Sequence, residues 1–236
     1  MNDIKRITIE NEKYPELLKQ IYDPPKCLYV MGNVEILNNP GIAIVGCREA
    51  TEYGKKAATY FAYNLAKQNI NIISGLAKGI DSYSHIGALQ ANGKTIAVIG
   101  SGLDIIYPKE NEQLAKKIIE QGGVIISEYP LGVRPEKEHF PARNRIISGM
   151  SRAVLVVEAK EKSGSLITAE FAMEQGKEVY AVPGNINSLN SVGTNNLIKD
   201  GAIPVSNFSD ILIWLWNFCR ILSMKNSLQN QNNVVT

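Results

Sequence analysis

The chain of 236 residues has few of the side chains that hold metal ions or form disulfides: three cysteines and two histidines. Cys27, Cys47 and Cys219 are scattered without CxxC spacing, and His85 and His139 do not accompany them in any ligand pattern. This argues against a structural zinc site and against a disulfide framework. It is typical of a protein from a reducing compartment.

Long apolar runs and a strong net charge are also absent. The amino-terminal stretch MNDIKRITIENEKY is charged and lacks the apolar centre of a signal peptide. Asn217 and Arg220 interrupt the apolar stretch 211–222, which is too short to span a bilayer. The net charge is only +2, so any anion site must be local rather than part of a strongly basic surface. We expect a cytoplasmic protein without a membrane partner.

From residue 41 onward, short apolar runs alternate with amphipathic segments. Strands are predicted at 42–45, 70–73, 95–99, 124–126, 153–157, 178–182 and 203–205. Helices are predicted at 54–68, 80–91, 111–121, 143–148, 165–175 and 195–199. Almost wholly apolar strands are typical of a sheet covered on both faces, and their alternation with helices favours parallel pairing. The sequence predicts an α/β fold with a Rossmann-like, doubly wound, mostly parallel sheet and helices on both faces.

Three regions are expected along the chain. Residues 1–40 read as an irregular amino-terminal extension in which 28–31 could form a short edge strand. Residues 41–205 are predicted to be the Rossmann-like domain. Residues 206–236 read as a short tail, with an apolar, helix-compatible stretch followed by an Asn/Gln-rich disordered end.

Residues that follow the predicted strands are the candidates for a site, because ligands of open α/β sheets bind beyond the carboxyl ends of the strands. Gly46, Cys47 and Arg48 follow the first strand, and Gly54 opens the next helix. Glycine lets the backbone approach a ligand, a helix start offers N–H groups, and the arginine fork suits phosphate. The plainer interpretation is a tight turn at Gly46 and a solvated Arg48.

The second strand is followed by a glycine-rich turn with Lys78, which again suits a phosphate before a helix. Asp81, Ser82 and His85 on that helix could form a catalytic group. The interpretation we favour is a helix-start aspartate with a neighbouring histidine, because nothing marks Ser82 as a nucleophile.

The segment from Lys137 to Arg145 is the most informative. Arg143 and Arg145 flank Asn144 near a predicted helix start, and Phe140 lies just before them. Arginines at a helix start suit an anion, and an aromatic beside them could stack on a base, as in single-strand binders. The plainer alternative makes Phe140 a core residue. It pairs the two arginines with nearby glutamates, namely Glu136, Glu138 or Glu158.

One more strand end carries small polar residues. Ser163, Gly164 and Ser165 can cap the helix that follows and present N–H groups to an anion, although capping alone is an equal alternative. Several strand ends thus carry glycine, serine or a basic residue. So extended a rim suits a polymer with repeated phosphates better than a single small ligand.

Several strings occur in one order over residues 14–205, among them IAIVGCRE, ISGLAKGIDSYSH, TIAVIGSGLDIIYPKEN, HFPARNRIISGMS and GTNNLIKDGA. With these strings the chain resembles the DNA-processing protein A (DprA/Smf) family. The resemblance implies an extended Rossmann fold that binds single-stranded DNA, forms a homodimer and hands DNA to the recombinase RecA. It implies protection of incoming DNA in natural transformation, and no catalytic activity, cofactor or metal.

The resemblance also implies roles for residues. The family's Gly-Ser/Thr-Arg phosphate loop falls on Gly46, Cys47 and Arg48, with cysteine where a hydroxyl residue is usual. Cysteine is a weaker donor, so the backbone N–H and Arg48 are expected to carry that contact.

Further matches extend the implied site and add an interface. The family's basic pocket corresponds to Lys78, Arg143 and Arg145, and the adjoining loop supplies Lys137 and Phe140. Dimerisation is implied near the end of the Rossmann region, at Leu197, Ile198 and Ala202. Residues 1–40 are too short for the helical domain of many members, and 206–236 do not read as a complete winged-helix domain.

Two other functions fit parts of the pattern. A phosphoribohydrolase of the lysine-decarboxylase-like type carries PGGxGTxxE at a comparable strand end. Here the string KSGSLIT lacks the double glycine, Thr168 stands where the glutamate should be, and Glu170 is two residues out of step. A dinucleotide-dependent oxidoreductase would depend on Gly100 and Gly102 alone, because Ile105 replaces the third glycine of GxGxxG.

Overall fold

The predicted apolar runs form the strands of one sheet in the computed structural model, which describes residues 4–213. The parallel strands are β3 (Gly41–Val45), β4 (Asn71–Ser74), β5 (Thr95–Val98), β6 (Val124–Ser127), β7 (Ala153–Val156), β8 (Glu178–Ala181) and β9 (Ile203–Pro204). The predicted doubly wound α/β fold is confirmed.

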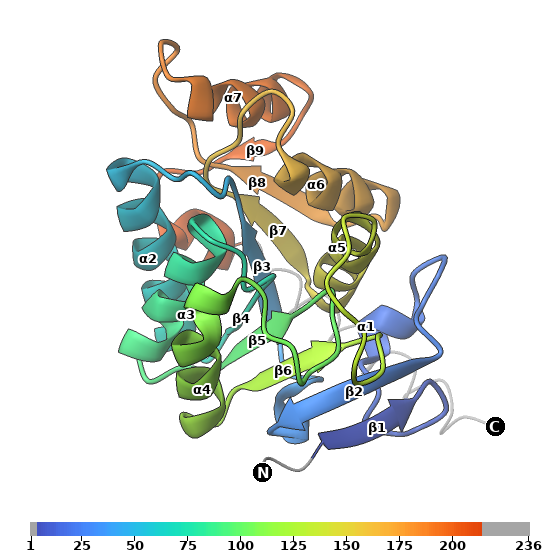
Figure 1. The fold of residues 1–236 in the computed structure, drawn as a ribbon. Coiled ribbons are helices and arrows are strands. Elements are labelled where there is room, and N and C mark those ends of the chain that lie inside the picture. Colours follow the sequence, from blue (N-terminus) through green and yellow to red (C-terminus); the bar gives the residue numbers. More distant parts are fainter. Residues whose placement is uncertain (1–3, 214–236) are drawn as a thin grey trace, which may run out of the picture.

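Helices cover both faces of the sheet (Figure 1). One face carries α2 (Glu52–Lys67), α3 (Ile80–Gln90) and α4 (Glu112–Glu120). The other carries α1 (Glu16–Lys19), α5 (His139–Met150), α6 (Gly164–Glu174) and α7 (Val192–Lys199). Helix α5 begins four residues before its predicted start, so Phe140 belongs to its first turn.

The amino-terminal segment is not the irregular extension expected from the sequence. It forms β1 (Ile4–Thr8) and β2 (Cys27–Gly32), which pair antiparallel, and β2 pairs antiparallel with β6. The predicted strand at 28–31 is therefore an inner strand, and β1 is the edge. Leu28 and Val30 are buried on one face while Tyr29 and Met31 pack on the other, so this strand joins both layers of the core.

The strand order β1-β2-β6-β5-β4-β3-β7-β8-β9 reverses direction next to β3. From β3 the chain adds β4, β5 and β6 on one side, and then returns through α5 to place β7 on the other side. The loops that leave β3 and β7 diverge at this point and open a crevice at the carboxyl edge.

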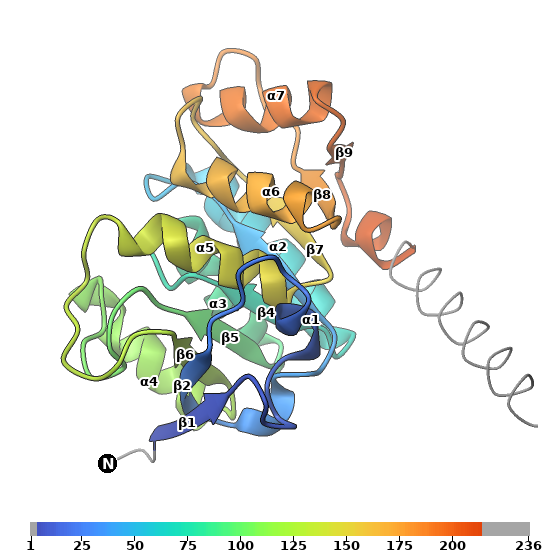
Figure 2. The same ribbon diagram turned by 90° about the vertical axis from the view of Figure 1, so that its right-hand side faces the viewer.

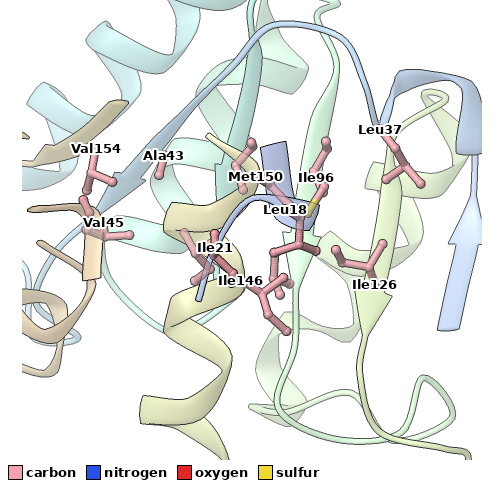
Figure 3. Close-up of a cluster of buried hydrophobic side chains, with 14 of the residues drawn as sticks. Leu18, Ile21, Leu37, Ala43, Val45, Ile96, Ile126, Ile146, Met150 and Val154 are labelled. Atoms are coloured by element: carbon pink, nitrogen blue, oxygen red, sulfur yellow. The ribbon is translucent and has the colours of Figure 1, made fainter. Parts of the chain in front are cut away.

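Alternation along β3 explains why its residues are all apolar. Ala43 and Val45 face the core beneath α5, where Leu18, Ile146 and Met150 converge (Figure 3). Ile42 and Ile44 point to the opposite face, beneath α2 and α3. Side chains of a strand alternate between faces, so both sets of side chains of a strand covered on both sides are buried.

A helical turn continues from residue 208 to 213 after β9. The expectations for the rest of the tail, residues 214–236, lie outside the described residues. Within residues 4–213, no helix has the length and hydropathy needed to cross a bilayer.

The carboxyl end of α5 is capped by a half-buried lysine, Lys177, from the turn before β8. The Lys177 ammonium donates to the carbonyl oxygens of Ser148, Gly149 and Ser151 at 2.6, 2.6 and 2.7 Å. Burial lowers the pKa of Lys177 to about 7, and Arg152 contributes to the shift. The three carbonyl oxygens oppose it by stabilising the charged form. This contact fixes the end of the helix whose start reaches the crevice.

We predict that Lys177→Met lowers the free energy of unfolding by about 2 kcal/mol, because it removes charged hydrogen bonds and leaves helix-end carbonyls without a donor. Urea unfolding followed by circular dichroism measures the change. Lys116→Met, at an exposed position of α4, is the matched control and should change stability by less than about 0.5 kcal/mol. Equal stabilities of the two variants would show that the cap contributes nothing.

Candidate nucleic-acid interface

A cavity of about 730 Å³ opens at the carboxyl edge, between the loops that follow β3 and β7. Most of the residues predicted to bind DNA line it: Gly46, Cys47, Arg48, Lys137, Phe140, Arg143, Asn144, Ser163, Gly164 and Ser165. Lys78 and Arg145 are not among the lining residues. The structure thus brings residues from three separate segments of the chain to one place, as the strand-end argument predicted.

Arg143 is buried at the floor of the cavity and is engaged with the sheet. Its Nη1 donates to the carbonyl oxygen of Gly75 at 2.7 Å and to that of Val98, and Nε donates to Asn144 Oδ1 at 3.2 Å. Burial lowers the pKa of Arg143 to about 10, so the guanidinium stays charged at neutral pH. Arg143 thus has the contacts of a positioning residue, because its hydrogen bonds hold α5 against the ends of β4 and β5.

Asp81 supplies the counter-charge for Arg143. Burial raises the pKa of this carboxyl group, and the charge of Arg143 and the N–H groups of Ala77 and Gly75 oppose that rise. Asp81 Oδ2 accepts from Gly75 N at 3.1 Å. A Cβ on Gly75 would lie 2.7 Å from both the guanidinium and this carboxylate, so only glycine fits between them.

The structure agrees with the favoured interpretation of Asp81, Ser82 and His85 on α3, in which they do not form a catalytic group. His85 is fully buried, and its Nδ1 lies 2.7 Å from Thr95 Oγ1. Burial lowers the pKa of His85 to about 3, so the ring is neutral. Ser82 donates to the carbonyl oxygen of Ala77 at 2.6 Å and does not contact His85.

Arg145 points away from the cavity, contrary to its predicted place in the basic pocket. Nη1 and Nη2 donate to the two carboxylate oxygens of Glu128 at 2.7 and 2.8 Å, and Nε donates to Asp23. Arg145 follows Arg143 by two residues, and such positions point about 200° apart on a helix of 3.6 residues per turn. Its contacts instead join α5 to the amino-terminal segment. The salt-bridge alternative therefore holds for Arg145, but with other acidic partners than those expected.

Lys78 lies outside the cavity lining and forms a salt bridge with Glu110 at 2.6 Å. Its side chain is about half exposed, so this pair is solvent-screened. A contact between Lys78 and DNA remains a prediction.

The Cys47 position does not offer a hydrogen bond to a ligand. Its backbone N–H donates to the carbonyl oxygen of Glu158 at 2.8 Å, and its thiol is buried against Glu158 and Asn190. The expectation that this N–H contacts phosphate is wrong, because it is already paired. Of the predicted phosphate loop, Arg48 alone presents an exposed donor side chain.

The start of α2 is likewise unavailable to an anionic ligand, because a carboxylate of the protein itself binds there. The buried carboxylate of Glu158 accepts from Thr51 N at 2.9 Å and from the Thr51 hydroxyl group, and Thr51 Oγ1 accepts from Gly54 N at 3.1 Å. A Cβ on Gly54 would lie 2.2 Å from Glu158 Oε2. The anion at this helix start is therefore the protein's own, and Gly54 makes room for it.

The start of α6 is open to the cavity. Ser163 makes no capping hydrogen bond to the backbone, and its Oγ lies 2.8 Å from Ser165 Oγ. Within residues 4–213, the N–H groups of Gly164 and Ser165 have no hydrogen-bond acceptor. Asn144 donates to the carbonyl oxygen of Gly164 at 3.2 Å and fixes this turn. An anion with several oxygens fits this helix start.

Two aromatic rings and a guanidinium group gather at the mouth of the cavity. Arg48 Cζ lies 5.3 Å from the ring centroid of Phe140, within cation–π range. The Tyr107 and Phe140 centroids are 5.6 Å apart at an interplanar angle of 41°. Phe140 is half-buried and lines the cavity, so the alternative that made it a core residue is wrong.

Among the lining residues that the sequence did not assign to the site are one aromatic residue and two cations, Tyr107, Lys160 and Lys162. Lys160 and Lys162 follow β7 directly, so the strand-end argument could have included them. Tyr107 lies nine residues after β5, too far along its loop for that argument. Lys160 pairs with Glu49 at 2.6 Å. Apart from the buried Arg143, the lining cations that form no salt bridge within residues 4–213 are Arg48, Lys137 and Lys162.

The residues predicted for dimerisation lie on and just after α7. Leu197 is buried in the core, and Ile198 and Ala202 are half-buried against the same cluster. Within residues 4–213, no group of three or more His, Cys, Asp and Glu side chains is gathered to hold a metal ion.

The different environments of the two cavity arginines predict different effects on stability. Arg143→Ala should lower the free energy of unfolding by about 3 kcal/mol, because it leaves Asp81 buried without its counter-charge. Arg48→Ala, at an exposed side chain, should change it by less than about 0.5 kcal/mol. Urea unfolding measures both. Similar losses for the two variants would contradict a positioning role for Arg143.

The thiol of Cys47 should resist alkylation in the folded protein. Burial and then the charge of Glu158 raise the pKa of Cys47 to about 12, so the reactive thiolate is absent up to about pH 10. We predict that iodoacetamide at pH 8 modifies Cys47 only after unfolding, as measured by peptide mass spectrometry. Rapid modification of the native protein would show that the loop after β3 opens.

The sequence and the fold are similar to those of known proteins. Residues 5–215 match the family described as DNA recombination-mediator protein A. Protein Smf of Escherichia coli is 47% identical over 206 residues, which cover 87% of this chain and 55% of that protein. The chain thus spans little more than half the length of this relative.

Two solved structures are similar over most of the chain. DNA processing protein A of Streptococcus pneumoniae gives a TM-score of 0.84 at 46% identity, with 89% of this chain and 74% of that chain covered. A structure concerned with the single-stranded DNA binding mode of DNA processing protein A from Helicobacter pylori gives 0.81 at 34% identity, with 92% and 99% covered. The extent of these matches establishes that the chain belongs to the DNA recombination-mediator protein A family.

Proposed function

We propose that this chain binds single-stranded DNA in the cavity, protects it and supports its transfer to a recombinase during recombination and natural transformation. The observation that carries this proposal is the cluster of Arg48, Phe140 and Tyr107 at the cavity mouth, beside the open start of α6. Aromatic rings next to phosphate-binding groups are the pattern of single-strand binders. The DNA-binding relative from Helicobacter pylori supports the same assignment.

The arrangement suggests which groups of the cavity contact phosphates and which contact a base. Arg48, Lys137, Lys162 and the N–H groups of Gly164 and Ser165 suit phosphate oxygens. The Phe140 ring, within the cavity, suits a base that has left its stack. In a duplex the bases are paired and stacked, so their faces cannot reach Phe140, and we expect duplex DNA to bind more weakly.

We further propose a homodimer and the recombinase RecA as partners, both implied by the family resemblance, with the cytoplasm as the location. Exposed apolar side chains near α7 are consistent with an interface, because Ile186 and Leu189 are 88% and 76% exposed. Ile198 and Ala202 could extend this surface, whereas Leu197 contributes through the core.

We propose a binding protein rather than an enzyme. Both carboxylates that line the described cavity are engaged, Asp81 beside Arg143 and Glu49 with Lys160. Thr168 is buried where a phosphoribohydrolase would need its glutamate. A cavity of about 730 Å³ could also hold a mononucleotide, so release of ribose phosphate from nucleoside monophosphates is the assay for the alternative function.

Fluorescence anisotropy with labelled oligo-dT tests the binding proposal. Arg48→Ala and Phe140→Ala should each weaken binding by about tenfold, through loss of a phosphate contact and of base stacking. Arg48→Ala should weaken binding to different sequences equally and reduce the salt slope by about 0.7, because phosphate contacts carry no sequence information.

Lys116→Ala, on α4 away from the cavity, serves as the control and should bind as the unaltered protein does. Unlabelled duplex should compete poorly. No binding at low salt would refute the proposal, and a changed sequence preference in Arg48→Ala would refute the phosphate role of Arg48.

A further inference from the structure

A second aromatic surface lies outside the cavity, on α2 and α3, which run side by side on one face of the sheet (Figures 1 and 2). We call it the α2–α3 groove. It has a volume of about 510 Å³. Its chief lining residues are Lys55, Lys56, Tyr60 and Tyr63 of α2, and Tyr83 of α3.

Close helix packing creates the groove. A Cβ on Gly87 of α3 would lie 2.6 Å from the Thr59 carbonyl oxygen of α2, so glycine allows the two backbones to approach. Lys56, Tyr60 and Tyr63 are spaced by four and three residues and share one face of α2. Thr59 also lines the groove between the helices.

Cations and aromatic rings alternate along this surface. Lys55 Nζ lies 5.7 Å from the centroid of Tyr83, and Lys67 Nζ lies 4.8 Å from that of Tyr63. Tyr60 is 40% exposed and is held edge-on by Phe61 at 5.3 Å. This chemistry matches a nucleic-acid strand, whose bases stack on rings while its phosphates meet cations.

The charge of the groove is positive. Lys55 pairs with Glu52 at 2.6 Å. Lys56 and Lys67 form no salt bridge within residues 4–213, and Glu52 is the one acidic residue in the groove lining. Phosphate groups would therefore meet Lys56 in the groove and Lys67 beside Tyr63, just outside its lining, and neither has a carboxylate partner within residues 4–213.

The groove lies close to the cavity along the chain, because Glu52 in its lining is three residues past Glu49, which lines the cavity. Gly79, just before α3, packs against the carbonyl oxygens of Cys47 and Arg48, where a Cβ would lie at 2.3 and 2.5 Å. Tyr83 lies one helical turn beyond this contact. At the start of α2, Thr51 is three residues past Arg48. A strand that leaves the cavity past Arg48 would meet the groove next.

We propose that the α2–α3 groove is a second contact surface for single-stranded DNA, used by the part of a strand that extends beyond the cavity. This inference rests on the proposed function of the cavity. An acidic protein would also meet the lysines, but continuity with Arg48 and the exposed rings favour a strand. The groove predicts that long strands bind more tightly than strands that only fill the cavity.

Anisotropy with oligo-dT of about 5 and about 16 nucleotides separates the two surfaces, since single-strand-binding folds span about that range. The variant Tyr60→Ala/Tyr63→Ala should lose about tenfold in affinity for the long strand and keep its affinity for the short one. Lys56→Gln should lower the salt slope for the long strand by about 0.7. Tyr22→Ala, at a fully exposed tyrosine beyond α1, is the control and should change neither affinity.

Crosslinking of a bromodeoxyuridine-substituted long strand to the unaltered protein gives an independent readout, and peptides with Tyr60 or Tyr63 should carry the adduct. An unchanged long-strand affinity in the double variant would overturn the groove proposal. So would an equal loss for both strands, which would place the effect in the cavity or the fold. Failure of the unaltered protein to bind either strand would instead refute the proposed function.

Discussion

The shape of the cavity depends on the hydrogen bonds between the buried guanidinium group of Arg143 and the sheet. This group holds the first turns of α5 against the carbonyl oxygens of Gly75 and Val98, at the ends of two neighbouring strands. Asp81 balances its charge, and Gly75 leaves space for both groups. Buried hydrogen bonds from a charged donor are costly to lose, so Arg143 fixes the position of α5 and with it Phe140 and Asn144.

The same internal pairing decides which groups remain for a ligand. Glu158 occupies the start of α2, Glu49 neutralises Lys160, and Glu128 neutralises Arg145. Arg48, Lys137, Lys162 and the open start of α6 are left facing the cavity. A chain of net charge +2 can therefore present a local anion site without a basic surface overall.

The sequence predicted the parallel sheet and ten of the residues that line the cavity, because strand ends of an α/β sheet meet at one edge. The sequence could not show that Arg143 and Arg145 have different roles. The two side chains point in different directions from α5, and their environments depend on partners distant in the chain, Gly75 for Arg143 and Glu128 for Arg145. Cys47 was misassigned for the same reason, because its N–H partner lies more than a hundred residues away at Glu158. The strand at 4–8 was missed, and the strand at 27–32 was placed at the edge of the sheet. The second strand lies inside the sheet because it pairs with β6, which is a tertiary contact, and the first pairs in turn with the second.

The most direct test is a crystal structure of the chain with a short oligo-dT. We predict a phosphate group against Arg48 and the N–H groups of Gly164 and Ser165, a base on Phe140, and Arg143 still bonded to Gly75 and Val98. A strand bound elsewhere, or an Arg143 that leaves the sheet to contact phosphate, would contradict this arrangement.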